Sequence, residues 1–495
     1  MNSVNIRKKI GENNPVIAQR FLADPYAIEY NGRVYVYGSN DSDSFYQDED
    51  GRYPRNEYGN IRSLNCISSA DLVNWTDHGV IQVAADKNKG VGGIAKWAGN
   101  SWAPAATYKT FTDEAGKEYT KFFLYFANSA SSIGVLSADS PEGPFTDPLG
   151  KPLITRENPG CEGVAWMFDP AVLMDDDGNA YIYFGGGVPE GMARNPRTAR
   201  VAKLGGDMIS IDGEEVIIDA PYMFEDSGIN KFGDTYYYSY CTNWSEEAGS
   251  AMGKAQIAYM TSKNPMGPFE YQGVAMKNPG QSEYFSPEAW GNNHHCMLQV
   301  DDQILMFYHT PQYELDMRFK FDMSKGACAY RTSYVDAVSI DDAGCLNVAK
   351  MTKSGTAEPL KQVNPFAVNP ANSFVWGENV TTALFNNDIL VKCDTAKGWF
   401  GIANIEASKL SSIKGIKVTA GANKNDCRLN IYINSIASAN MLAEVVIPAG
   451  ADTLSEVLTE VNAVPVVSDK VCSLIIEAAG LEESDSVLVK QWQLL

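Results

Sequence analysis

The stretch WMFDPAVLMDDDGNAYIYFGGG, residues 166–187, contains the pattern that recurs through most of the chain. Asp169-Pro170 opens a short apolar run, and Asp177-Gly178 separates that run from an aromatic-rich one. Asp-Gly supplies the positive φ angles that a tight hairpin needs, so each run is predicted to be a β-strand of one hairpin.

The same unit occurs at four other places in the chain. The copies read DPYAIEYNGRVYVYGSND from Asp24, APAATYK from Ala103, EDSGINKFGDTYYYSYCTNW from Glu225 and NHHCMLQVDDQILMFYHT from Asn293. Several copies are followed by a bend and a short strand that suit a sheet edge, at 68–79, 137–148 and 261–273. Five inner hairpins with outer strands predict an all-β fold and a five-bladed β-propeller, with a β-sandwich of similar strand number as the alternative.

The repeats end near residue 350, and the composition then changes. Residues 351–373 are polar and contain three prolines, which is typical of a linker. Residues 374–495 carry alternating runs such as RLNIYINS and SLIIEAAG, which predict a separate β-sandwich (jelly-roll). The expected domains are therefore a propeller over 1–350, a linker over 351–373 and a sandwich over 374–495.

Composition excludes several classes of partner. Among 495 residues, Lys and Arg number 40 and Asp and Glu 61, which gives a net charge of −21. Such a chain repels phosphate backbones and anionic lipid surfaces, so neither a nucleic acid nor a membrane is expected to bind. The nine cysteines are scattered without a C-x-x-C pair, which argues against a disulfide framework and a cysteine zinc site. No apolar run follows the basic N-terminus, so a cytoplasmic location is expected; the oligomeric state is left open.

Three repeat copies begin with an acidic residue: Asp24, Asp169 and Glu225. The first strand of each propeller blade lines the central axis, so these carboxylates are expected to meet at one mouth. Like charges held together raise the pKa of at least one of them, and a carboxylate pair is the usual apparatus for cleaving glycosidic bonds. Taken singly, each acid could cap a turn instead, and a non-catalytic sugar-binding propeller is the alternative class of function.

Aromatic and basic side chains also lie near the strand starts. Sugars stack on aromatic faces, and the tryptophans in question are Trp102, Trp166, Trp244 and Trp290; packing in the core is the alternative. Arg331 is a candidate hydrogen-bond donor to hydroxyls. His294 and His295 are neighbours in a strand, so only one can face the axis, where it could bind a metal, orient a carboxylate or simply pack. The chain lacks a P-loop, H-E-x-x-H and G-x-S-x-G, which excludes those enzyme classes.

The segments ADPYAIEYNGRVYVY, NSWAPAA, WMFDPAVLMDDDGNAYIYFGG, MFEDSGINKFGDTYYYSY and NHHCML resemble glycoside hydrolase family 43. The resemblance covers about residues 15–350, and its spacing is nearest to the arabinoxylan arabinofuranohydrolase branch. It implies a five-bladed propeller and an inverting mechanism. In it Asp24 is the general base, Asp169 orients the acid and raises its pKa, and Glu225 is the general acid.

The acid motif of that family is often Glu-Gly-Pro, whereas this chain has Glu225-Asp226-Ser227. The register of the repeat favours Glu225 over Asp226 as the acid. The resemblance also implies that Trp166 and Trp244 form walls of the sugar pocket and that Arg331 contacts substrate, whereas Trp102 is a substrate-binding candidate from its place near a repeat start. The resemblance assigns the axial position to His295, as a substrate-binding residue and a metal residue beside a calcium ion at the propeller axis; no organic cofactor is expected.

The C-terminal region resembles carbohydrate-binding module family 6 in WGENV (376–380), KGWFGIANIEAS (397–408) and VLVKQWQLL (487–495). Trp399 is its one clear stacking aromatic, so packing against the propeller is predicted over glycan binding.

Together these features predict an exo-acting α-L-arabinofuranosidase that releases arabinose from arabinoxylan-derived oligosaccharides. A β-D-xylosidase, or one site with both activities on xylo-oligosaccharides, is the alternative, because arabinofuranose and xylopyranose can present similar hydroxyl groups. An endo-arabinanase is the weaker third reading.

Overall fold

The computed structural model describes residues 4–86, 90–320, 329–395, 397–422, 424–450, 453–461, 463–482 and 485–495. Strands dominate these ranges, which confirms the all-β prediction. The helices are short: α1 (Glu246–Ala251), α2 (Gln312–Lys320) and 3₁₀ turns at Asp41–Ser44, Tyr58–Asn60, Pro279–Gln281, Pro287–Ala289, Ala407–Ser412 and Ser438–Asn440. No helix in the described ranges is long and apolar enough to cross a membrane.

Five antiparallel sheets follow one another along the described part of residues 22–338, each built from strands consecutive in sequence. The first two contain β2 (Leu22–Tyr30), β3 (Arg33–Asn40), β4 (Leu64–Ser69) and β5 (Trp75–Ile81), then β6 (Trp102–Thr112), β7 (Glu118–Asn128) and β8 (Ser132–Ala138). The third contains β9 (Ala171–Met174), β10 (Ala180–Phe184), β11 (Ala199–Leu204) and β12 (Val216–Ile218). The last two contain β13 (Met223–Phe232), β14 (Thr235–Thr242), β15 (Ile257–Ser262) and β16 (Glu270–Met276), then β17 (His295–Val300), β18 (Gln303–Thr310) and β19 (Thr332–Val338).

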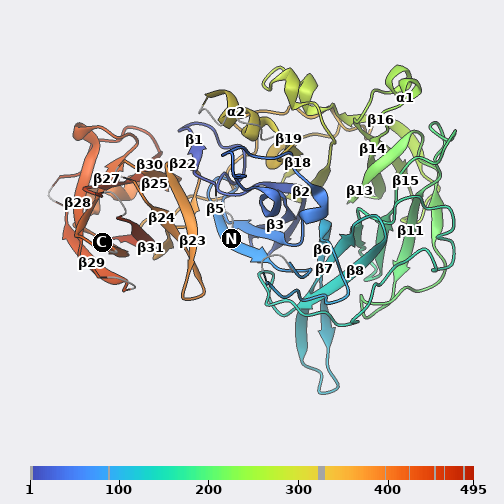
Figure 1. Cartoon of the computed structure of the whole chain (residues 1–495), viewed down its shortest axis with the longest axis horizontal. Helices are drawn as coiled ribbons and strands as arrows, with labels where there is room; N and C mark the ends of the chain where they lie inside the picture. Colours follow the sequence, from blue (N-terminus) through green and yellow to red (C-terminus); the bar gives the residue numbers. More distant parts are fainter. Residues whose placement is uncertain are drawn as a thin grey trace.

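The five sheets close into a ring. Their first strands contact one another in the cycle β2, β6, β9, β13, β17 and back to β2. Figure 1 shows the sheets arranged around this centre, with the β6–β7 hairpin projecting from the rim. Aromatic and aliphatic side chains fill the space between blades, and β10 is buried along its whole length. This closed ring is a five-bladed β-propeller, in which radial repetition leaves only short sheet edges.

A shared irregularity marks the start of four blades. Asp24, Ala103, Asp169 and Asp226 all have positive φ angles, between 26° and 66°. In three of these blades the strand register shifts at the same place, between Ala23 and Tyr26 in the first and at matching points in the second and fourth. A left-handed residue at a bulge turns its side chain out of the regular alternation, and Asp tolerates that conformation better than most residues.

Two further sheets form the C-terminal region. One runs in the order β1 (Arg7–Lys8), β22 (Trp376–Glu378), β25 (Trp399–Glu406), β30 (Val471–Ala479), β27 (Cys427–Ile433) and β28 (Met441–Ile447). The other contains β23 (Val380–Phe385), β24 (Asp388–Cys393), β31 (Val487–Leu494), β26 (Gly415–Ala422) and β29 (Ser455–Glu460), with β20 (Asn369–Pro370) beside β31. Both contribute to one apolar cluster, which includes Val391, Ile431, Val445, Leu474 and Val489.

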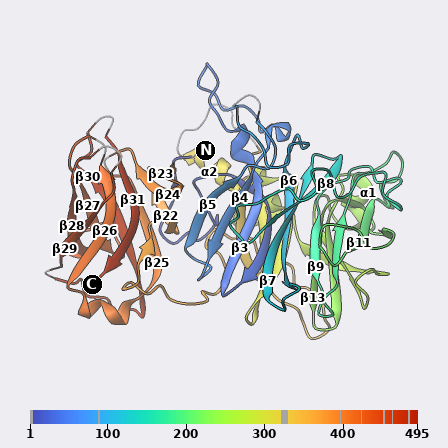
Figure 2. The same cartoon turned by 90° about the horizontal axis from the view of Figure 1, so that it is seen from below.

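The two regions exchange short strands. β1, from the range predicted for the propeller, pairs with β22 of the C-terminal region. β21 (Ser373–Phe374), at the predicted end of the linker, pairs in return with β5 of the first blade. Figure 2 shows the regions side by side, with β24 next to β5. Each region therefore contributes a short strand to a sheet of the other, across the domain boundaries predicted at residues 350 and 373.

The cysteines in the described ranges all carry free thiols, and every one except Cys345 is buried. Cys328 lies outside the described residues. The thiols act as small apolar groups in the cores, as their scattered spacing predicts.

Candidate active site

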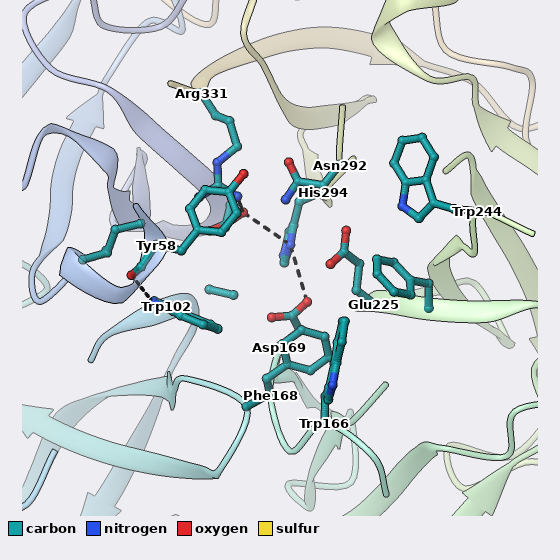
Figure 3. Close-up of a pocket in the computed structure, with 15 residues that line it drawn as sticks. Tyr58, Trp102, Trp166, Phe168, Asp169, Glu225, Trp244, Asn292, His294 and Arg331 are labelled. Carbon is teal, nitrogen blue, oxygen red and sulfur yellow. Dashed lines mark hydrogen bonds and ion pairs between the residues drawn. The ribbon is translucent and has the colours of Figure 1, made fainter. Parts of the chain in front are cut away.

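A pocket of about 440 Å³ opens at the mouth of the propeller, where the blades begin (Figure 3). Its lining comprises Asp24, Tyr58, Ile61, Trp102, Ala103, Ala130, Trp166, Phe168, Asp169, Phe224, Glu225, Trp244, Asn292, His294 and Arg331. The structure thus brings together the three predicted carboxylates with Trp102, Trp166, Trp244 and Arg331. Trp290 is not in the lining but lies edge-on to Trp244, with ring centroids 6.1 Å apart.

Asp24, at the start of the first blade, is held by contacts on two sides. Nη1 of Arg331 donates to Oδ1 of Asp24 at 2.8 Å, and the backbone N–H of Asp24 donates to Nδ1 of His309 at 3.0 Å. Burial alone would raise the pKa of Asp24, but the charge of Arg331, together with His309 and His294, holds that pKa well below its usual value. Asp24 is therefore ionised throughout the neutral range and suits a base.

Glu225 has the opposite electrostatics. Its side chain is buried, and Oε1 finds no hydrogen-bond partner among the described residues. Burial, and after it the neighbouring charges of Asp169 and Asp24, raise the pKa of Glu225 well above its usual value. A carboxyl group with these surroundings keeps its proton near neutral pH and can give it to a substrate oxygen.

Asp169, at the start of the third blade, lies near both of these groups. Its Oδ2 accepts the backbone N–H of Asp226 at 2.9 Å and lies 3.9 Å from Nδ1 of His294. Burial raises the pKa of Asp169 to about 7, and the charge of Asp24 contributes in the same direction while His294 opposes it. The charge of Asp169 in turn helps to raise the pKa of Glu225.

Asp226, not Glu225, occupies the repeat position of Asp24 and Asp169, which corrects the register argument used in the sequence analysis. The Asp226 carboxylate is fully buried and is used by two histidines, with Oδ1 3.1 Å from Nε2 of His294 and Oδ2 2.6 Å from Nδ1 of His295. Glu225, one residue earlier, faces the pocket instead. The bulge at this point directs the two neighbouring carboxyl groups differently, that of Glu225 into the pocket and that of Asp226 towards the histidines.

His294, rather than His295, reaches the pocket. The prediction had placed His295 at the axis as a substrate and metal ligand, and its position corrects that. Nδ1 of His295 pairs with Asp226, and Nε2 lies 2.7 Å from the Ser239 hydroxyl, so both ring nitrogens are engaged. Nor do the described residues hold a group of three or more His, Cys, Asp or Glu side chains that could bind a metal ion. As arranged, these residues do not fit a calcium ion held by His295.

The aromatic walls depend on two glycines that lie shortly after β10. The Trp166 ring lies edge-on to Phe168 and Phe224, at 5.4 and 5.1 Å between centroids. Any Cβ on Gly186 would lie 2.3 Å from the Phe224 carbonyl oxygen, and one on Gly187 would lie 3.0 Å from the Trp166 ring. These glycines therefore allow the Trp166 wall to approach the segment that carries Glu225.

Tyr58, Asn292 and His294 line the pocket but were not predicted to do so. Tyr58 comes from the long connection between β3 and β4, which no repeat marks, and its carbonyl accepts the indole N–H of Trp102 at 2.9 Å. Asn292 and His294 immediately precede β17, and only the pairing of that strand distinguishes His294 from His295. The aromatic-walled pocket holds an ionised carboxylate that can act as a base, a protonated carboxyl group that can act as an acid, and a third carboxyl group. This combination defines the site of a glycoside hydrolase.

Comparison with known proteins identifies the family. The model of glycosyl hydrolases family 43 matches residues 12–340, and the chain belongs to this family of enzymes that cleave glycosidic bonds. The chain is 44% identical over 377 residues to arabinoxylan arabinofuranohydrolase of Paenibacillus polymyxa, which covers 75% of this chain and 56% of that protein. It is 40% identical over 478 residues to arabinoxylan arabinofuranohydrolase of Bacillus subtilis (strain 168), which covers 93% of this chain and 88% of that protein.

A solved structure extends the likeness to the whole chain. The crystal structure of a family 43 arabinoxylan arabinofuranohydrolase from Bacillus subtilis, in complex with cellotetraose, aligns with a TM-score of 0.89 at 37% identity. The alignment covers 100% of this chain and 99% of that one. By contrast, the chain spans little more than half the length of the Paenibacillus polymyxa relative.

Proposed function

We propose that this glycoside hydrolase is an exo-acting, inverting α-L-arabinofuranosidase that releases arabinose from arabinoxylan-derived oligosaccharides. The observation that carries the proposal is the opposite shift of two carboxyl pKa values in one pocket, lowered at Asp24 and raised at Glu225. The two relatives described above, both arabinoxylan arabinofuranohydrolases, support the choice of sugar.

In the proposed reaction Glu225 gives its proton to the glycosidic oxygen while the bond to the anomeric carbon breaks. Asp24 takes a proton from a water molecule, whose oxygen attacks that carbon from the opposite face. One inversion results, and arabinose leaves with the opposite anomeric configuration. Asp169 keeps the pKa of Glu225 high and, through the N–H of Asp226, fixes the segment that carries the acid.

The substrate is proposed to enter between the aromatic walls of the pocket. Trp166 and Trp244 are 38% and 36% exposed, which leaves faces on which a sugar ring or a neighbouring xylose unit can stack. A β-D-xylosidase, or a dual activity, is the alternative, because the same walls and donors would accept a xylopyranose ring.

Initial rates on nitrophenyl α-L-arabinofuranoside and β-D-xylopyranoside, with arabinoxylo-oligosaccharides alongside, test the proposal. We expect fast release of arabinose with little xylose, and proton NMR of the fresh product should show the inverted anomer. Comparable rates on both glycosides would favour the dual activity. Release of neither sugar would rule out an exo-acting enzyme.

We also propose that the C-terminal region is a β-sandwich that stabilises the propeller rather than a glycan-binding module. Its exchanged strands and the contacts of Asn74 with Ala403 of β25 support this role. The Asn74 side chain donates to the carbonyl of Ala403 and accepts the N–H of Ala403, both at 2.9 Å. Affinity electrophoresis in arabinoxylan with Trp399→Ala checks the alternative, since a glycan-binding module would lose retardation in that variant.

A further inference from the structure

Asp41 lies directly behind the pocket and does not line it. It begins the short helical turn Asp41–Ser44 after β3, and its side chain is fully buried. Its Oδ2 accepts Nε of Arg331 at 2.9 Å and the Arg331 backbone N–H at 3.0 Å, while Oδ1 accepts Nη2 at 2.8 Å. The Asp41 backbone N–H donates to the carbonyl of Phe21 at 3.0 Å, so both the backbone and the side chain of Asp41 are held in place.

These contacts orient the Arg331 guanidinium so that Nη1 points away from Asp41. With Nε and Nη2 facing Asp41, Nη1 faces Oδ1 of Asp24 at 2.8 Å. The ring of Tyr58 covers the guanidinium at 4.6 Å from its centroid. A guanidinium is planar and its N–H groups form a rigid fork, so fixing two of them fixes the third.

The same contacts close the ring of blades. Arg331 leads into β19 of the fifth blade, whereas Asp24 and Asp41 belong to the first. Next to Arg331, the Tyr330 hydroxyl donates to the carbonyl of Ser44 at 2.9 Å and lies 3.0 Å from that of Pro54. The junction of the first and last blades is therefore built around one guanidinium and two carboxylates.

We propose that Asp41 is a positioning residue, which orients the Arg331 guanidinium so that Nη1 meets the carboxylate of Asp24. The proposal rests on the role of Asp24 as the base. Asp41 touches neither substrate nor reacting atoms and acts only through Arg331. Without the Asp41 carboxylate, the Arg331 guanidinium can rotate, and Asp24 is then no longer held in a fixed position.

A double-mutant cycle tests whether Asp41 acts through Arg331. We expect Asp41→Asn to lower kcat on nitrophenyl α-L-arabinofuranoside about 10- to 100-fold, with a smaller change in KM. In an Arg331→Lys background, which already lacks the fork, the same change should cost less than about threefold. Asp48→Asn is the matched control, because Asp48 accepts backbone N–H groups in the same connection without touching Arg331.

Equal losses in both backgrounds would overturn the proposal, as would full activity of Asp41→Asn. If Asp41→Asn fails to fold, judged by thermal unfolding, the cycle is repeated with Asp41→Glu, which keeps the charge but moves it by one methylene. A loss of activity in Asp41→Glu that vanishes in the Arg331→Lys background supports the proposal, and a loss that persists contradicts it. Asp24→Asn is assayed in parallel, because near-native activity there would refute the role of the base and not the coupling of Asp41 to Arg331.

Discussion

Two buried clusters of charge in this enzyme are built in opposite ways. At the junction of propeller and C-terminal region, Asp77 pairs with Arg20, and Gln19, Gly79 and Thr382 donate to its remaining lone pairs at 2.7–3.1 Å. At the mouth, Glu225 has negative neighbours, and its Oε1 has no hydrogen-bond partner within the part of the chain that the structure describes.

The pKa values record the difference. Burial alone would raise the pKa of Asp77, but Arg20 and the other donors lower it below the usual value. At the mouth, burial and like charges raise the pKa of Glu225 and bring that of Asp169 to about 7. The junction uses buried charge to hold two regions together, while at the mouth Glu225 faces like charges, so its proton is available for chemistry.

The largest effect is expected from replacing the carboxyl groups of Glu225 and Asp24 at the mouth by amides. Glu225→Gln and Asp24→Asn should each lower turnover at least about a hundredfold, because each removes one partner of acid–base catalysis. When folding raises the pKa of a carboxyl group, the folded protein loses stability as pH rises from the pKa of that group in the unfolded chain to its pKa in the folded one. The thermal midpoint of Glu225→Gln at pH 7 should therefore equal or exceed that of the parent enzyme. Near-native turnover in either variant would contradict the role assigned to that residue.

At the junction the same kind of change should reduce stability instead. Asp77→Asn leaves the Arg20 guanidinium buried beside a neutral amide, so the free energy of unfolding in urea should fall by about 3–5 kcal/mol. Turnover per folded molecule should stay near that of the parent enzyme. Asp212→Asn is the control, because Asp212 pairs with Lys203 at 3.2 Å on the surface, where about 0–1 kcal/mol is expected. A loss for Asp77→Asn no greater than for the control would remove the contrast.

Asp169→Asn should sharpen the comparison within the mouth. Activity requires protonated Glu225, so it is lost as pH rises through the pKa of that group. Since the charge of Asp169 helps to raise this pKa, its removal should move the basic limb of the kcat/KM profile about one unit or more towards lower pH. An unmoved limb would show that the charge of Asp169 does not contribute to the pKa of Glu225.

The smallest effect is expected from one hydrogen bond across the junction. Thr382→Val removes the hydroxyl that donates to Asp77 from the C-terminal region at 3.1 Å but keeps the shape of the side chain. A loss of about 0.5–1.5 kcal/mol in the free energy of unfolding is expected, with kcat unchanged. A loss as large as that of Asp77→Asn would mean that the Asp77 carboxylate acts mainly through this one hydrogen bond.

Much of the propeller could be predicted because its evidence is local. Asp-Gly and Asn-Gly turns, strand alternation and a unit repeated five times depend on backbone preferences within about twenty residues. Asp24 and Asp169 were found by the same signal, since each precedes a proline at a strand start and each adopts the left-handed conformation there.

The exchanged strands could not be predicted in this way. β1 and β21 are two residues long, and their partners lie hundreds of residues away in the sequence. No periodicity exists in two residues, so only the packing of whole sheets assigns them. The long connection that brings Tyr58 to the pocket is likewise fixed by distant contacts, such as that between Trp102 and the Tyr58 carbonyl.

The sequence by itself determined the all-β class, the repeat and the presence of several carboxylates at one mouth. Only the tertiary structure decided that Asp226 takes the repeat position while Glu225 faces the pocket, and that His294 rather than His295 lies there. In each pair the residues are neighbours of similar chemistry, so pattern cannot separate them. The bulge, the strand pairing and the partners already present, such as Ser239 beside His295, decide which side chain is turned towards the substrate.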